Sequence, residues 1–141
     1  MGLNLGDPIP GVGRSVSEEL LEPTRIYVKP VLELIREVRV RAMAHITGGG
    51  ITENLPRVLP AQRRARIDPR AWPQPPIFAA IQRAAAVDDA EMRRTFNMGI
   101  GFVIVVAPED AAGAMRHLEA LGERVYPIGE IVPGKAGVDY V

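Results

Sequence analysis

The segment over residues 44–60 carries the residue types best suited to holding a ligand. A short apolar run ends at His45 and Thr47, three consecutive glycines follow, and a helix start is predicted next. Residues without a Cβ let the backbone adopt positive φ and approach a ligand closely. The N–H groups at the start of a helix favour an anion such as phosphate. A tight strand-to-helix turn without a ligand fits the same spacing, so the residues alone leave both interpretations open.

The two histidines differ in their predicted surroundings. His45 lies near the end of a predicted strand, where an imidazole could donate to a ligand oxygen or move a proton near neutral pH. The residues alone favour a core histidine that bonds to the backbone. His117 falls on the polar face of a helix predicted over 108–121 and is interpreted as solvated. Two histidines so placed give no recognisable metal spacing.

A second informative segment covers residues 95–101 and joins a predicted helix to a predicted strand. Asn97 offers both a donor and an acceptor, while Gly99 and Gly101 permit close backbone approach. A turn with a β-bulge explains the same residues equally well. Neither glycine segment matches the GxxxxGK[ST] pattern, and Gly11-Val12-Gly13 lacks the third glycine of a dinucleotide fingerprint. Any nucleotide role must therefore use another geometry.

The elements that position these segments alternate between helix and strand. Ser15 and Glu18 form a predicted capping box, and Pro30 places the next helix start near Lys29. The continuous apolar run over 101–107 predicts a strand buried on both faces. The other predicted elements are strands over 40–47, 65–68 and 125–132, and helices over 51–58, from 77, from Asp88 and over 108–121. The pattern predicts the α/β or α+β class, a mixed β-sheet with helices packed on it.

Composition excludes several classes of protein. The 141 residues balance 17 Lys and Arg against 17 Asp and Glu, which is unlike a basic nucleic-acid-binding domain. No apolar run is long enough to span a bilayer, so neither nucleic acid nor membrane is an expected partner. The absence of cysteine excludes disulfides and thiolate metal sites and fits a cytoplasmic protein.

Seven segments follow one another in an informative order. They are Leu-Glu-Pro-Thr-Arg-Ile-Tyr-Val (21–28), His-Ile-Thr-Gly-Gly-Gly (45–50), Glu-Asn-Leu-Pro-Arg-Val-Leu-Pro (53–60), Trp72-Pro73, Pro76-Ile77-Phe78, Met92 and Arg-Thr-Phe-Asn-Met-Gly-Ile-Gly (94–101). Together they resemble phosphoribosylformylglycinamidine cyclo-ligase, the AIR synthetase family of de novo purine synthesis. The first and last of these segments disfavour related kinases and synthetases of the thiamine-phosphate or selenophosphate type.

The resemblance implies the C-terminal domain of a two-domain, homodimeric enzyme. In that family ATP activates the amide oxygen of formylglycinamidine ribonucleotide, and an amidine nitrogen attacks. The imidazole ring of aminoimidazole ribonucleotide then closes, and ADP and phosphate leave. ATP and Mg²⁺ are expected mainly through the N-terminal domain, so no metal ligand is expected in this chain.

The resemblance also implies roles for individual residues. His45, Thr47 and Asn97 are the expected catalytic residues, which would orient the reacting groups. The expected contacts to the substrate or its phosphate are Gly48, Gly49, Gly50, Asn54, Thr95, Gly99 and Gly101.

The predicted division of the chain is an N-terminal arm or loop over 1–14 and an AIR synthetase C-terminal-type domain over 15–141. The family's first segment of this domain, with a His-Ser-Asn-Gly-Tyr-Ser-type motif, is expected before Gly2, and Met1 is then expected to be an introduced or misplaced start. The chain alone is accordingly expected to be inactive and to expose apolar surface that favours self-association. The alternative is a non-catalytic binding or assembly module that keeps the fold.

Overall fold

The computed structural model describes residues 2–141, so the expectation for Met1 lies outside the described residues. The helices are α1 (Val16–Leu20), α2 (Val28–Glu37), α3 (Gly50–Asn54), the 3-10 helix η1 (Leu55–Val58), α4 (Pro76–Ala85), α5 (Asp89–Thr95) and α6 (Pro108–Ala120). The strands are β1 (Ala42–His45), β2 (Arg63–Ile67), β3 (Phe102–Val105), β4 (Gly129–Pro133) and β5 (Val138–Tyr140). This mixture of helices and mixed sheets confirms the predicted α+β class.

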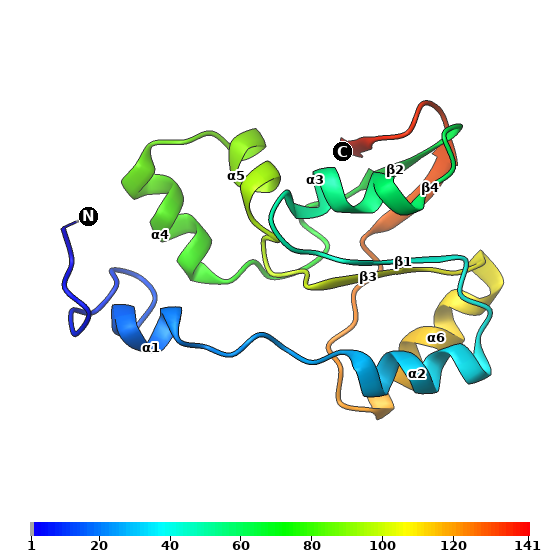
Figure 1. Ribbon diagram of the computed structural model, residues 1–141, viewed down its shortest axis with the longest axis horizontal. Coiled ribbons are helices and arrows are strands. Elements are labelled where there is room, and N and C mark those ends of the chain that lie inside the picture. Colours follow the sequence, from blue (N-terminus) through cyan, green and yellow to red (C-terminus); the bar gives the residue numbers. More distant parts are fainter. Residues whose placement is uncertain (1) are drawn as a thin grey trace.

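The strands of the described residues form two separate sheets. β1 and β3 pair antiparallel, with Ala42 opposite Val105 and His45 opposite Phe102. β2 lies at the centre of the second sheet, antiparallel to β4 and parallel to β5. In Figure 1, β1 and β3 run through the middle of the molecule, with α2 and α6 on one side and α3, β2 and β4 on the other.

Local sequence signals set the helix starts. Ser15 Oγ accepts from the Glu18 N–H at 3.4 Å, and the Glu18 carboxylate accepts from the Ser15 N–H at 2.9 Å, which confirms the capping box. Asp88 caps α5 by accepting from the Glu91 N–H at 2.8 Å. Pro30 lies in the first turn of α2, where no helical N–H bond is lost.

The prediction that the 101–107 strand is buried on both faces is wrong. β3 spans only Phe102–Val105, and Val103 alone of its residues is buried. The reason is that β3 pairs with β1 and with no other strand among residues 2–141. An apolar run predicts burial, but the number of partners that a strand has is a tertiary property.

The interpretation of His117 as solvated is also wrong in part. The ring is half-buried, and its Nε2 is shielded from solvent without a hydrogen-bond partner among residues 2–141. His117 precedes the buried Leu118 on α6, and α6 packs against α2. A residue at the border of a helix's buried face can therefore be covered by the neighbouring helix.

Residues 2–14 form a turn-rich segment that is attached to the start of α1. Pro8 and Ser15 form an isolated antiparallel bridge, and Ile9 is buried. The division of the chain at residue 14 stays a prediction.

The Leu34 side chain in α2 is fully buried, at 0% exposure, while Leu32 in the same helix is 49% exposed. We expect Leu34→Ala to lower the free energy of unfolding by about 2–5 kcal/mol, because it removes buried methyl groups and leaves a void. Leu32→Ala is the matched control, with an expected change within about 0.5 kcal/mol. Urea denaturation of both variants measures this, and equal losses would contradict the packing described for α2.

Candidate functional site

The pairing of β1 with β3 brings the two glycine-containing segments together. His45 ends β1 opposite Phe102, which begins β3, and the Ile46 N–H donates to Gly101 O at 2.8 Å. Because the strands are antiparallel, the chain leaves β1 and enters β3 at the same end of the pair. The glycine loop (residues 46–50) and the 97–101 turn are therefore neighbours, although about 50 residues separate them in sequence.

Gly50 is required by packing. Its φ is +56°, and a Cβ there would collide with the backbone oxygen of Arg93 and lie 2.5 Å from that of Phe96. The start of α3 thus rests directly on the end of α5. Thr52 strengthens this contact, because its hydroxyl donates to Arg93 O at 3.1 Å.

Gly48 and Gly49 differ in backbone conformation and in how closely other atoms surround them. Gly49 has φ +97°, a left-handed conformation that favours glycine. Gly48 has no positive φ, is exposed, and has nothing within 4 Å of the position its Cβ would take. Its missing side chain therefore leaves open surface at the mouth of the loop.

Asn54 lies beneath the glycine loop, 7% exposed. Its Nδ2 donates to the carbonyls of Gly48 at 3.1 Å and Gly50 at 2.8 Å, with a longer bond to Thr47 O at 3.4 Å. Its Oδ1 accepts from Arg57 at 3.5 Å. A buried amide satisfied in this way holds the loop's carbonyls inward. The ligand contact expected of Asn54 stays a prediction, and its observed contacts position the loop.

His45 directly precedes this loop and Thr47 belongs to it, and both residues are exposed. The interpretation of His45 as a core histidine is wrong, because strand alternation turns Ala44 and Ile46 inward and His45 outward. The His45 ring lies 6.1 Å from the Phe102 ring, between centroids, and 6.0 Å from that of Tyr27.

Tyr27 belongs to this aromatic group but was not predicted as a site residue. Its ring centroid is 5.3 Å from that of Phe102, and its hydroxyl occupies the space that a Cβ on Gly101 would need. Partial burial raises the pKa of the Tyr27 hydroxyl. The available signal was an aromatic residue in the short segment between Pro23 and the start of α2.

Residues 97–100 form a tight turn, which agrees with the turn part of the turn-and-bulge interpretation and leaves the ligand interpretation open. Ile100 N–H donates to Asn97 O at 3.0 Å, and Met98 and Gly99 between them have φ of +52° and +98°. The Gly99 N–H donates to Asn97 Oδ1 at 2.9 Å. The turn thus uses the oxygen of the Asn97 side chain, and the Nδ2 of the same amide is its donor group.

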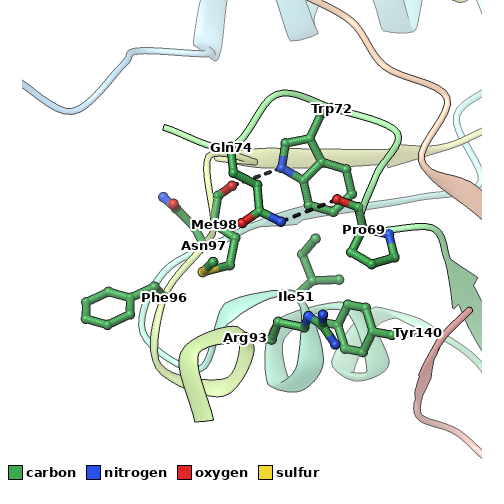
Figure 2. A pocket seen from close by; sticks show the side chains of 9 residues that line it. All are labelled: Ile51, Pro69, Trp72, Gln74, Arg93, Phe96, Asn97, Met98 and Tyr140. Atoms are coloured by element: carbon green, nitrogen blue, oxygen red, sulfur yellow. Dashed lines mark hydrogen bonds between the residues drawn. The ribbon is translucent and has the colours of Figure 1, made fainter. Parts of the chain in front are cut away.

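Trp72 fixes this turn from behind (Figure 2). Its Nε1 donates to Met98 O at 2.9 Å, and the indole is buried. Pro75 lies against Gly99, 2.5 Å from where a Cβ would be. The turn is thus held by packing and by one buried hydrogen bond.

Thr95 lies in the last turn of α5 and is exposed. Its hydroxyl donates to the Glu91 carboxylate at 3.2 Å, along the helix. The binding role expected of Thr95 stays a prediction.

The region behind the loop is closely packed. Figure 2 shows Arg93 against the Tyr140 ring, with 4.8 Å between the Arg93 Cζ and the ring centroid. The Tyr140 and Thr52 hydroxyls are 2.9 Å apart, and burial raises the pKa of the Tyr140 hydroxyl. The pocket that Arg93 and Tyr140 line with Ile51 holds only about 10 Å³, which is too small for a ligand.

Charged side chains also flank the loop. The Glu53 carboxylate lies beside Gly49 and pairs with Arg94 at 3.0 Å and with Arg57 at 3.9 Å. All three side chains are exposed, so these pairs add little stability. The two guanidinium groups are nevertheless positioned near the loop and are suited to an anionic ligand.

Residues 2–141 contain no group of three His, Asp or Glu side chains that could hold a metal ion. Within the same range no helix is long and apolar enough to cross a membrane.

Comparison with known proteins places the chain in a family. Residues 3–141 match the model described as "AIR synthase related protein, C-terminal domain", and the chain belongs to this family. It is similar to proteins named phosphoribosylformylglycinamidine cyclo-ligase in several bacteria. The protein of Brevibacillus brevis is 49% identical over 139 residues, which are 99% of this chain and 40% of the relative. That of Cupriavidus pinatubonensis is 54% identical over 119 residues, which are 84% of this chain and 34% of the relative.

The chain spans about 40% of the length of the relatives it matches. The protein of Citrifermentans bemidjiense, for example, is 47% identical over all 141 residues, but these make up 40% of that protein. The family match and the names of these relatives confirm the resemblance to the AIR synthetase family.

Substitutions of Gly48 and Gly50 in the loop should differ in their effect on stability. We expect Gly50→Ala to lower the free energy of unfolding by about 2–4 kcal/mol, because it combines a left-handed backbone with a collision against the α5 backbone. Gly48→Ala should change it by less than about 0.5 kcal/mol, since the added methyl group meets open space. Urea denaturation measures both, and a large loss for Gly48→Ala would show that the loop is more closely packed than described.

Proposed function

We propose that this chain forms the C-terminal part of an ATP-dependent phosphoribosylformylglycinamidine cyclo-ligase. The enzyme would close the imidazole ring of aminoimidazole ribonucleotide in cytoplasmic purine synthesis. The observation that carries the proposal is the juxtaposition of the glycine loop with the 97–101 turn at one end of the β1–β3 pair. Family membership and the names of the relatives support it.

The proposed site receives the ribonucleotide substrate on the open side of Gly48. An exposed glycine lets a phosphate or ribose group approach the backbone without meeting a side chain. Arg57 and Arg94 lie beside the loop and would add positive charge for an anionic group. Asn54 would keep the loop in place while the ligand binds.

His45, Thr47 and Asn97 are the side chains proposed to act on the reacting groups. His45 and Thr47 are exposed at the end of β1, so both can reach a ligand seated on the loop. The Asn97 Nδ2 can donate to an oxygen on which negative charge develops during the transfer. ATP, when bound, supplies the phosphoryl group that activates the amide oxygen, and Mg²⁺ neutralises phosphate charge.

ATP and Mg²⁺ are proposed to bind mainly through the N-terminal domain of such an enzyme, as the family resemblance implies. A homodimer of the two-domain enzyme is the proposed assembly. The chain by itself is proposed to lack turnover.

The effect of Gly48→Ala on ligand binding can be measured separately from its effect on folding. We expect Gly48→Ala to weaken binding of formylglycinamidine ribonucleotide at least about 10-fold, because the methyl group occupies the approach path. Gly113→Ala is the matched control, since Gly113 on α6 also has nothing within 4 Å, and it should leave binding unchanged. Isothermal titration calorimetry of the three proteins measures this, and equal affinities would argue against a ligand at the loop.

Turnover tests the proposed roles of the side chains. In a full-length cyclo-ligase, alanine at the positions matched to His45 and Asn97 should lower kcat/KM by about 10²–10³-fold, the range typical for a lost proton-transfer or charge-stabilising group. The purified 141-residue chain should show no ATP-dependent ring closure. An unchanged kcat/KM would refute the roles of the side chains, whereas ring closure by the chain alone would refute only the need for further polypeptide.

A further inference from the structure

A carboxylate of the chain itself lies against the glycine loop. A Cβ on Gly49 would lie 2.9 Å from the Glu53 Oε2 and 2.9 Å from the Glu53 Cβ. The Glu53 side chain comes from the first turn of α3, so it is folded back over the backbone of the loop. The space that a glycine opens for a close approach to the backbone is thus filled by a negatively charged group of the same chain.

Two guanidinium groups lie beside this carboxylate. The Arg94 Nε donates to the Glu53 Oε1 at 3.0 Å, and the Arg57 Nη2 lies 3.9 Å from the Glu53 Oε2. The space beside Gly49 that the carboxylate fills, next to both arginines, is called the anion position below. A guanidinium group binds carboxylate and phosphate oxygens with the same donor geometry. A phosphate group can therefore take the place of the Glu53 carboxylate.

The loop offers backbone donors at the same place. The Gly48 and Gly49 N–H groups donate to no backbone carbonyl among residues 2–141, whereas the Gly50 N–H donates to Thr47 O at 3.0 Å. Successive N–H groups in a turn favour the binding of anions. The surroundings of the anion position are thus positively polarised by the backbone as well as by the two arginines.

The contacts that hold Glu53 in the anion position are weak. Its side chain is 41% exposed, and the side chains of Arg94 and Arg57 are 66% and 65% exposed. Ion pairs as exposed as these contribute little stability, because water competes for both partners. A phosphate group carries about two negative charges and has three strong acceptor oxygens. A phosphate that is part of a larger bound ligand can therefore displace the carboxylate.

We propose that the Glu53 carboxylate occupies the position of the substrate's phosphate group and leaves it when the ribonucleotide binds. This inference rests on the proposed function and adds a determinant of specificity to it. Displacement of Glu53 lowers the affinity for every anion at this position by the same factor. Inorganic phosphate, which has no other contacts in the site, is thereby kept out, whereas the ribonucleotide also contacts the rest of the loop and the 97–101 turn.

Calorimetric titration with three ligands tests this proposal. They are formylglycinamidine ribonucleotide, the matching ribonucleoside and inorganic phosphate, at an ionic strength of about 10 mM, where exposed charges are little screened. The unsubstituted chain should bind the ribonucleotide at least about 10-fold more tightly than the ribonucleoside. Glu53→Gln should tighten the binding of both phosphate-bearing ligands by the same factor of about 5 or more, because it removes the competing charge. It should leave ribonucleoside binding unchanged.

A second glutamate provides the matched control. Glu130 on β4 is also exposed and also pairs with an arginine, Arg66, at 3.3 Å. Glu130→Gln changes the net charge of the chain by the same amount, but it should change none of the three affinities. Circular dichroism checks that both variants are folded.

The carbon signal of the Glu53 carboxylate in an NMR spectrum reports displacement directly. Saturation with the ribonucleotide should move this signal toward the position that it has in the Arg94→Gln variant, in which the pair is absent. The ribonucleoside should leave the signal in place. A signal that does not move when the ribonucleotide binds would show that the carboxylate stays at Arg94, and would overturn the proposal.

Four calorimetric results would also overturn the proposal. Unchanged or weaker ribonucleotide binding by Glu53→Gln would mean that Glu53 holds the arginines for the ligand. Equal tightening by Glu130→Gln would mean that only the net charge matters. Equal binding of ribonucleotide and ribonucleoside would mean that no phosphate lies at the anion position, but it would leave the proposed function intact. Binding of neither ligand by the folded chain would count against the proposed function and this proposal together.

Discussion

The antiparallel pairing of β1 with β3 is the constraint on which the candidate site depends. Its register, with His45 opposite Phe102, fixes the end of the pair at which the chain leaves one strand and enters the other. A slip by one residue would turn Ala44 and Ile46 outward and His45 inward, at a cost in buried apolar surface. The core therefore holds the register, and the register holds the glycine loop next to the 97–101 turn.

The residues around this site fall into two groups: those that hold its backbone in place and those that remain exposed to solvent. Gly50, Gly99 and Gly101 are glycines because other groups occupy the space beside them: the backbone of α5, Pro75 and the Tyr27 hydroxyl. Asn54 and Trp72 hold backbone carbonyls of the loop and of the turn through buried hydrogen bonds. Gly48, His45 and Thr47 remain exposed on this rigid support, a distribution typical of binding sites carried by loops.

Much of the fold could be predicted from the sequence, because local signals determine it. The capping box at Ser15, the proline in the first turn of α2 and the helix after the glycines all depend on neighbouring residues. The surroundings of β3, His117 and Tyr27 depend on contacts between distant segments, which periodicity does not encode. For the same reason, the sequence singled out the glycines as informative positions. It could not show which of them are required by close contacts with distant segments. The juxtaposition of the two segments followed only from the strand register.

We infer that the glycine loop and the 97–101 turn act as one ligand site. The most direct measurement is an NMR titration of the isotopically labelled chain with formylglycinamidine ribonucleotide, following the backbone amides of both segments. We expect the amides of residues 46–50 and 97–101 to shift together and to report one dissociation constant. Shifts in only one segment, or two different dissociation constants, would contradict it, as would a complete absence of shifts in both.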